Sequence, residues 1–128
     1  MKNPLDLVQD IFEENESIAL GEVFRLLIKT CHRSEYVMDG ISEYVFLRRE
    51  SGVELSKSEW DEIKTWMVEN WSQDPEFVSN AVWLIYHGHM SKIAFLVKSA
   101  SQSTNDDVRR DASMVIEQWN SVYEDFIH

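Results

Sequence analysis

Residues 74–85, DPEFVSNAVWLI, and residues 105–116, NDDVRRDASMVI, decide the predicted fold, because the same pattern recurs after about 31 residues. When the two segments are superposed, their apolar positions coincide, and so do the small residues Ala81 and Ala112. Between them, residues 90–98, MSKIAFLVK, form another amphipathic segment. The pattern predicts the order helix, short turn, helix, loop, helix over residues 74–119.

This unit resembles a HEAT repeat, which opens on an acidic cap, continues with a Val-Arg pair and places an Ala one turn later. Only the second copy has the pair, at Val108 and Arg109. The resemblance covers roughly a third of the chain, and its period is short for an alpha solenoid. It implies a right-handed stack of helical hairpins.

Helix-start signals and apolar spacing predict four further helices before this unit. The signals are Asn3 before Pro4, Ser17, Ser34, and Ser56 with Glu59 three residues later. Gly52 and Gly88 are predicted to end helices, and Gly40 to mark a close helix crossing. The last two of the seven predicted helices cover residues 90–100 and a segment capped by Thr104 or Asn105, with an apolar seam at Val108, Ala112, Val115, Trp119, Val122 and Phe126.

No segment alternates between apolar and polar residues in the way that a strand does. We therefore predict an all-α fold of about seven helices, arranged as a HEAT-like stack, in a single domain over residues 1–128. A chain of 128 residues is long enough to bury a core without a metal or a disulfide. Cys31, the only cysteine, lies on an apolar stripe and is interpreted as a small buried hydrophobic residue.

The charge of the chain limits its partners. It has 23 acidic and 12 basic residues, and its formal net charge is −11. Such a charge disfavours binding to nucleic acid or to an anionic membrane and favours a basic protein partner. With no disulfide, no signal-peptide pattern and no apolar run near the roughly 20 residues of a membrane span, we expect a cytoplasmic protein.

No pattern for catalysis or metal binding is found. His87 and His89 are paired imidazoles, but zinc needs three or four ligands and the only thiol, Cys31, is predicted on another helix. The pair fits a helix-ending turn better. Acidic pairs such as Asp106-Asp107 and Asp61-Glu62 suit helix starts. We expect neither a metal nor a cofactor, and no enzyme activity.

Two acidic stripes are the candidate binding surface. In each, acidic residues recur three or four positions apart around one large aromatic residue. A solvated helix face is the plainer interpretation, but few Lys or Arg residues are interspersed to form helical ion pairs, and aromatic residues are enriched in binding hot spots. The predicted partner-binding residues are Glu59, Glu62, Trp66 and Glu69 in one stripe, and Asp39, Glu43, Phe46 and Glu50 in the other.

A small, acidic, all-helical chain without catalytic motifs resembles bacterial immunity proteins in kind, although no residue can be carried over. The resemblance implies a protein that binds and neutralises a basic toxin, such as a nuclease, in the cytosol. Two alternatives remain open: a HEAT-like scaffold or adaptor for peptides or assemblies, and an enzyme that uses carboxylates or His87 and His89. The sequence does not predict an oligomeric state.

Overall fold

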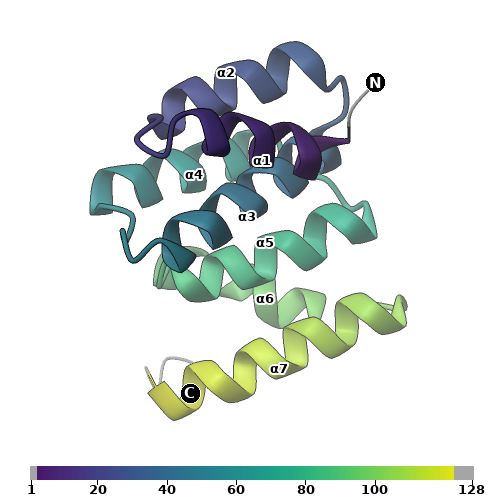
Figure 1. The fold of residues 1–128 in the computed structure, drawn as a ribbon. Helices are drawn as coiled ribbons and strands as arrows, with labels where there is room; N and C mark the ends of the chain where they lie inside the picture. The colour runs from purple at the N-terminus through teal and green to yellow at the C-terminus, as the bar shows by residue number, and fades with distance from the viewer. Residues whose placement is uncertain (1–2, 123–128) are drawn as a thin grey trace. The chain divides into compact units, whose positions relative to one another are not determined.

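The computed structural model describes residues 3–122, and over this range the chain is all-helical, with no strand (Figure 1). The predicted fold class and the number of helices are confirmed. The helices are α1 (Pro4–Glu14), α2 (Leu20–Thr30), α3 (Ser34–Glu50), α4 (Lys57–Glu69), α5 (Pro75–His87), α6 (Phe95–Ala100) and α7 (Asp106–Val122), with a 3-10 turn, η1 (Ser91–Ile93), before α6.

The contacts of the chain group into two compact units, Met1–Ser72 and Gln73–His128. Each unit has buried apolar residues of its own. The single-domain organisation and the right-handed HEAT-like stack therefore stay predictions.

Most helices begin where the capping signals place them. The side chain of Asn3 accepts a hydrogen bond from the backbone N–H of Asp6 at 2.9 Å, and that of Asp74 accepts one from Glu76 at 2.9 Å. Ser56 and Glu59 form both bonds of a capping box at the start of α4. At α7, Asn105 accepts from the N–H of Val108 at 3.1 Å. These caps satisfy N–H groups that the first helical turn leaves without partners.

Two predicted helix starts are wrong. α2 begins at Leu20 rather than Ser17, because the Asn15 side chain accepts from the Ser17 N–H at 3.1 Å and holds that segment in a turn. The N-cap of α3 is Arg33, whose side chain makes no capping bond, and Ser34 is the first helical residue. Neither helix has a side-chain cap at its start.

In the first unit, α3 packs against both α1 and α2 (Figure 1). The crossing of α2 and α3 is close at Gly40, where an added Cβ would lie 2.5 Å from a methyl carbon of Leu27. The prediction for Gly40 is confirmed. Cys31 is buried, also as predicted. The core of this unit includes Val8, Leu20, Val23, Leu27, Met38, Ile41, Tyr44, Ile63 and Met67.

In the second unit, α7 packs against α5 and α6. Positions that coincide in the two copies of the sequence pattern are buried in both helices: Phe77 and Val108, Ala81 and Ala112, and Leu84 and Val115. The repeated sequence pattern therefore marks the buried face of α5 and of α7. The seam ends at the fully buried Trp119, since Val122 is 59% exposed, contrary to the prediction. Phe126 lies outside the described residues.

The segment predicted as one helix over residues 90–100 is instead divided into the 3-10 turn η1 and the helix α6, which begins only at Phe95. The turn before it, at the end of α5, also differs in detail from the prediction. α5 ends in a Schellman motif, in which the N–H groups of His89 and Met90 donate to the carbonyl groups of Tyr86 and Ile85. The left-handed position of this motif is His89, with φ 48°, and not Gly88, with φ −85°. The His89 ring packs 5.4 Å from that of Trp119, which offsets part of the cost of this backbone conformation.

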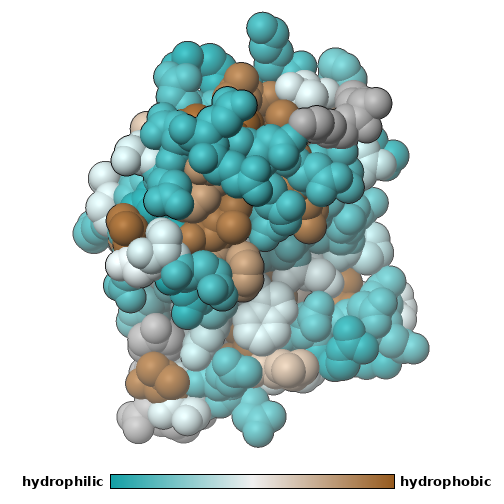
Figure 2. Space-filling view, viewed as in Figure 1, coloured by the Kyte–Doolittle hydropathy of each residue, from teal (hydrophilic) through white to brown (hydrophobic). Residues whose placement is uncertain are grey.

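Hydrophilic residues cover most of the surface in view, with hydrophobic residues in patches between them (Figure 2). Among the described residues, the large apolar side chains that are exposed in the first unit are Leu5, Ile28, Phe46, Val53 and Val68. Those in the second unit are Phe95, Met114 and Val122. One of them, Ile28, belongs to a groove with one acidic wall.

Candidate functional site

A groove in the first unit lies between α2 and α4 and has a volume of about 420 Å³. Residues on one face of α4, three or four positions apart, form one wall, and Phe24 and Ile28, one turn apart on α2, form the other. The lining residues of α4 are Ser58, Asp61, Glu62, Thr65, Trp66 and Glu69.

The apolar part of the groove is an aromatic pair. The ring centroids of Phe24 and Trp66 are 5.6 Å apart, with the planes inclined at 42°. Phe24 is buried and Trp66 half-buried, whereas Ile28 is 51% exposed. The groove therefore has an aromatic base and, at Ile28, an aliphatic edge that is still in contact with water.

All the charged residues that line the groove are acidic. Asp61, Glu62 and Glu69 line it, and none of the lining residues is Lys or Arg. Asp61 has an ion pair with Lys57 at 3.7 Å, which is exposed and therefore weak. No Lys or Arg of the described residues pairs with Glu62 or Glu69. The groove thus presents negative charge that the first unit does not neutralise.

Glu62 also lies close to the backbone of α2. A Cβ added to Gly21 would lie 3.5 Å from a carboxylate oxygen of Glu62. The Glu62 carboxylate therefore lies near the first turn of α2, whose free N–H groups favour negative charge.

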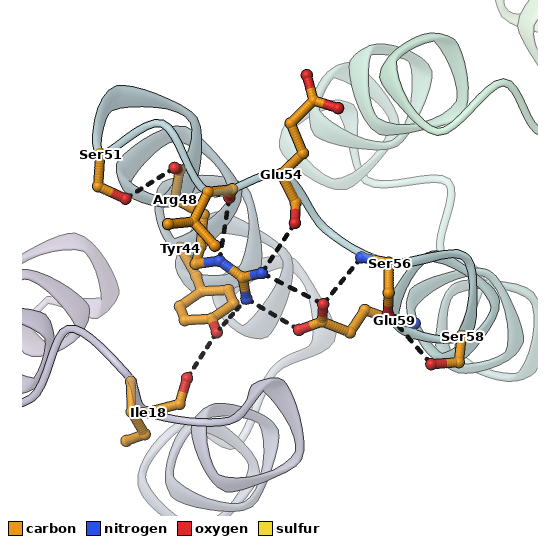
Figure 3. A network of polar contacts seen from close by, with 9 residues as sticks. Ile18, Tyr44, Arg48, Ser51, Glu54, Ser56, Ser58 and Glu59 are labelled. Atoms are coloured by element: carbon orange, nitrogen blue, oxygen red, sulfur yellow. Dashed lines mark hydrogen bonds and ion pairs between the residues drawn. The ribbon is translucent and has the colours of Figure 1, made fainter.

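Glu59, which we predicted in the same stripe, does not line the groove. Its carboxylate is held by Arg48, with N–O distances of 2.9 and 3.2 Å, and by the N–H of Ser56 at 2.9 Å (Figure 3). The residue therefore serves the fold: it completes the capping box of α4 and neutralises a buried guanidinium. Of the four residues predicted in this stripe, the groove brings together Glu62, Trp66 and Glu69.

Arg48 joins four segments of the first unit. Its five N–H groups donate to the Tyr44 hydroxyl, to both oxygens of Glu59 and to the carbonyl oxygens of Val53 and Glu54. Tyr44 in turn donates to the carbonyl of Ile18 at 2.7 Å (Figure 3). The network ties α3 to the α1–α2 loop, the α3–α4 loop and the first turn of α4, and so it fixes the start of the helix that forms one wall of the groove.

The network shifts the ionisation of its members. Hydrogen bonds from Arg48 lower the pKa of Glu59 most strongly; burial opposes this shift, and the Ser56 backbone N–H adds to it. Burial is the main reason that the pKa of Tyr44 is raised. The ion pair is therefore charged at neutral pH, and the phenol stays protonated as a donor to Ile18.

The residues of the second predicted stripe, on α3, do not form one open surface. Glu43 accepts a hydrogen bond from the Gln9 side chain of α1 at 2.9 Å, and Asp39 is half-buried. Asp39 is near Cys31, whose pKa is raised mainly by burial and in addition by this carboxylate. Only Phe46, which is 54% exposed, and Glu50 face outward. α1 packs along α3 and divides the stripe.

His87 and His89 belong to an aromatic cluster of the second unit. His87 packs against Trp83 and Tyr86, with ring centroids 6.1 and 5.2 Å away, and His89 packs against Trp119. Within residues 3–122, no group of three or more His, Cys, Asp or Glu side chains is placed to hold a metal ion. The prediction that the protein uses no metal or cofactor is unaffected.

The sequence alone did not place Phe24, Ile28 and Asp61 in the groove. Phe24 and Ile28 belong to an apolar stripe whose helical spacing predicts burial for both; it consists of Leu20, Val23, Phe24, Leu27, Ile28 and Cys31. Asp61 was explained by the start of a helix. The exposure of Ile28 shows that the apolar stripe of α2 is wider than the core that it faces, and this width is the sequence signal for the α2 wall of the groove.

No family model, curated protein or solved structure matches the chain. Fold and site together define an all-helical protein with an acidic groove over an aromatic base. No helix in residues 3–122 has the length and apolar character needed to cross a membrane.

Proposed function

We propose that this protein is an acidic protein-binding module whose groove between α2 and α4 binds a basic segment of a protein partner. One observation carries the proposal: three carboxylates and no cation line a groove whose base is the Phe24–Trp66 pair. A buried aromatic anchor slows dissociation, and surrounding negative charge accelerates the encounter with a cationic partner.

The most specific form of the proposal is an immunity protein that neutralises a basic bacterial toxin, such as a nuclease. A toxin that binds nucleic acid has a positively charged surface of its own. A chain of net charge −11 suits such a surface, and a groove that engages it also blocks access of the nucleic acid. No chemistry by the immunity protein itself is required.

The test uses the product of the neighbouring reading frame as the partner. Purified partner is titrated with wild-type protein and with the double variant Glu62→Lys/Glu69→Lys. The matched control is Glu13→Lys/Glu14→Lys, which changes the net charge equally at exposed positions of α1 that do not line the groove. All three proteins are checked by circular dichroism for unchanged helicity.

We expect tight binding by wild type and a loss of at least about 100-fold in affinity for the groove variant, because two attractive contacts become repulsive. The control should lose less than about tenfold, since it alters only the long-range field. Equal affinities for the two variants would exclude the groove, and a partner that binds none of the three proteins would exclude the immunity function.

An adaptor would behave differently in the same experiment. It would bind several unrelated partners weakly, and its affinity would depend on no single co-encoded protein. An enzyme would turn over a small substrate in isolation. Neither alternative is favoured by a feature of the described residues.

A further inference from the structure

We propose that the segment bound in this groove is an amphipathic helix with two basic residues seven positions apart and an apolar residue between them. The inference rests on the proposed function and specifies the shape and charge pattern of the ligand. It follows from the order of charges along α4.

Glu62, Trp66 and Glu69 lie on one face of α4 and line the groove in the order acid, aromatic, acid, and Asp61, which is paired with Lys57, lies at the Glu62 end. With a rise of 1.5 Å per residue, the two acidic positions are about 10 Å apart along the helix axis, with the indole between them. A complementary partner presents two cations at about the same separation, with an apolar group at the middle.

A helix meets this requirement and an extended chain does not. In a helix, residues seven apart share one face at a separation of about 10 Å, and the residues three or four along lie between them on the same face. In a strand, residues on one face are separated by about 6.6 Å or 13 Å, and residues three apart, at about 10 Å, point to opposite sides. The spacing of the acids therefore selects a helical ligand.

The walls of the groove support this choice. α2 contributes Phe24 and Ile28, one helical turn apart, and α4 contributes Thr65 and Trp66. The rings of Phe24 and Trp66 are in contact across the groove. Two helices with an apolar channel between them form the usual receptor for a third amphipathic helix. The half-exposed Ile28 is covered when that helix binds.

Synthetic peptides test the inference with the full-length protein. The first probe is an alanine-rich helical peptide with two arginines seven positions apart and two leucines between them, three and four positions after the first arginine. The second has the same composition with the arginines five positions apart, so that they point to different sides. The third keeps the seven-residue spacing and replaces an alanine between them with proline, which prevents the helix.

Binding is measured by isothermal titration calorimetry against wild type and against Glu62→Gln/Glu69→Gln, in which the charges are removed and the shape is kept. We expect the first peptide to bind wild type at least tenfold more tightly than the second and the third. The glutamine variant should lose this preference. Equal binding of the first two peptides, equal binding of the proline peptide, or no binding of any peptide would overturn the inference.

The two proposals fail separately. A natural partner whose binding is lost in Glu62→Lys/Glu69→Lys supports the groove as a binding site, even if the peptides show no preference for spacing. In that case only the helical charge pattern is wrong. A spacing preference together with failure of the neighbouring gene product to bind leaves the groove and the ligand class intact and removes the toxin as the partner.

Discussion

Arg48 is the residue on which the local order of the first unit depends most. It is 9% exposed, and all five of its N–H groups have acceptors. Breaking such a pair from one side leaves a charge without its partner in a poorly solvated place, which costs more than the pair contributes. Glu59 is the partner that titrates in an accessible range of pH.

We predict that Glu59→Gln destabilises the protein by roughly 1–3 kcal/mol at pH 7. The folded state lowers the pKa of Glu59, chiefly through Arg48, so the stability that its charge contributes is present above the unfolded value of about 4.3 and is lost as the pH falls through the folded pKa. The free energies of unfolding of wild type and variant, measured with urea from pH 7 to pH 3, should therefore become more similar below about pH 4.3. If the two free energies of unfolding differed by the same amount from pH 7 to pH 3, the proposed stabilising role of the Glu59 charge would be contradicted.

Gly40 gives a second prediction at a single position. A Cβ there would lie 2.5 and 2.6 Å from the two methyl carbons of Leu27, which is fully buried and has no room to withdraw. We expect Gly40→Ala to destabilise by about 1–3 kcal/mol, despite the better helix propensity of alanine. Gly21→Ala is the matched control: its Cβ meets nothing nearer than 3.5 Å, so thermal denaturation should show a small gain or no change.

Helix α7 allows the two possible caps to be separated experimentally. Asn105 accepts from the N–H of Val108, whereas Thr104 is exposed and has no partner among the described residues. Asn105→Ala should cost about 1 kcal/mol of stability. Thr104→Ala should stay within about 0.5 kcal/mol of wild type. Chemical unfolding of both variants measures these two losses of stability. A larger loss in Thr104→Ala than in Asn105→Ala would assign the cap to Thr104.

Elements with a local start signal were predictable from the sequence. Asn3, Ser56, Asp74 and Asn105 each form the capping bond that their position implies, because a cap involves only the next three residues. The start of α2 was missed because its N-cap, Ala19, offers no side-chain acceptor. The helix end at Gly88 was predictable, but the 3-10 turn at Ser91–Ile93 was missed because the apolar periodicity of residues 90–98 continues through it into α6. The left-handed position of the turn at His89 was also missed, since that position usually holds a glycine.

The groove was predictable only in part. The stripe of Glu62, Trp66 and Glu69 follows from spacing within one helix. The packing of Phe24 against Trp66 joins two helices that are distant in sequence, and no local pattern specifies it. The pairing of Glu59 with Arg48 was missed for the same reason, since Arg48 belongs to the preceding helix.

For the whole molecule, charge is the property that sets how a partner approaches. Residues 1–72 contain 15 of the 23 acidic and 8 of the 12 basic residues, so they carry −7 of the net charge of −11. Dissolved salt screens the electric field of these charges, with a Debye length of about 10 Å at 0.1 M and about 3 Å at 1 M. We predict that the association rate of a basic partner falls at least tenfold between about 0.05 and 0.5 M salt, measured by stopped-flow fluorescence, while the dissociation rate changes less. A rate independent of salt would exclude electrostatic steering.

The most direct test of the binding groove is to map the contact on the isotope-labelled full-length protein by nuclear magnetic resonance, with the purified product of the neighbouring reading frame as ligand. We expect the amide signals of Phe24, Ile28 and Thr65 and the indole signal of Trp66 to shift or broaden as the partner is added. Signals of Phe46 and Glu50 on α3 should remain in place. Perturbation of Phe46 and Glu50 with an unchanged Trp66 indole would exclude binding in the groove.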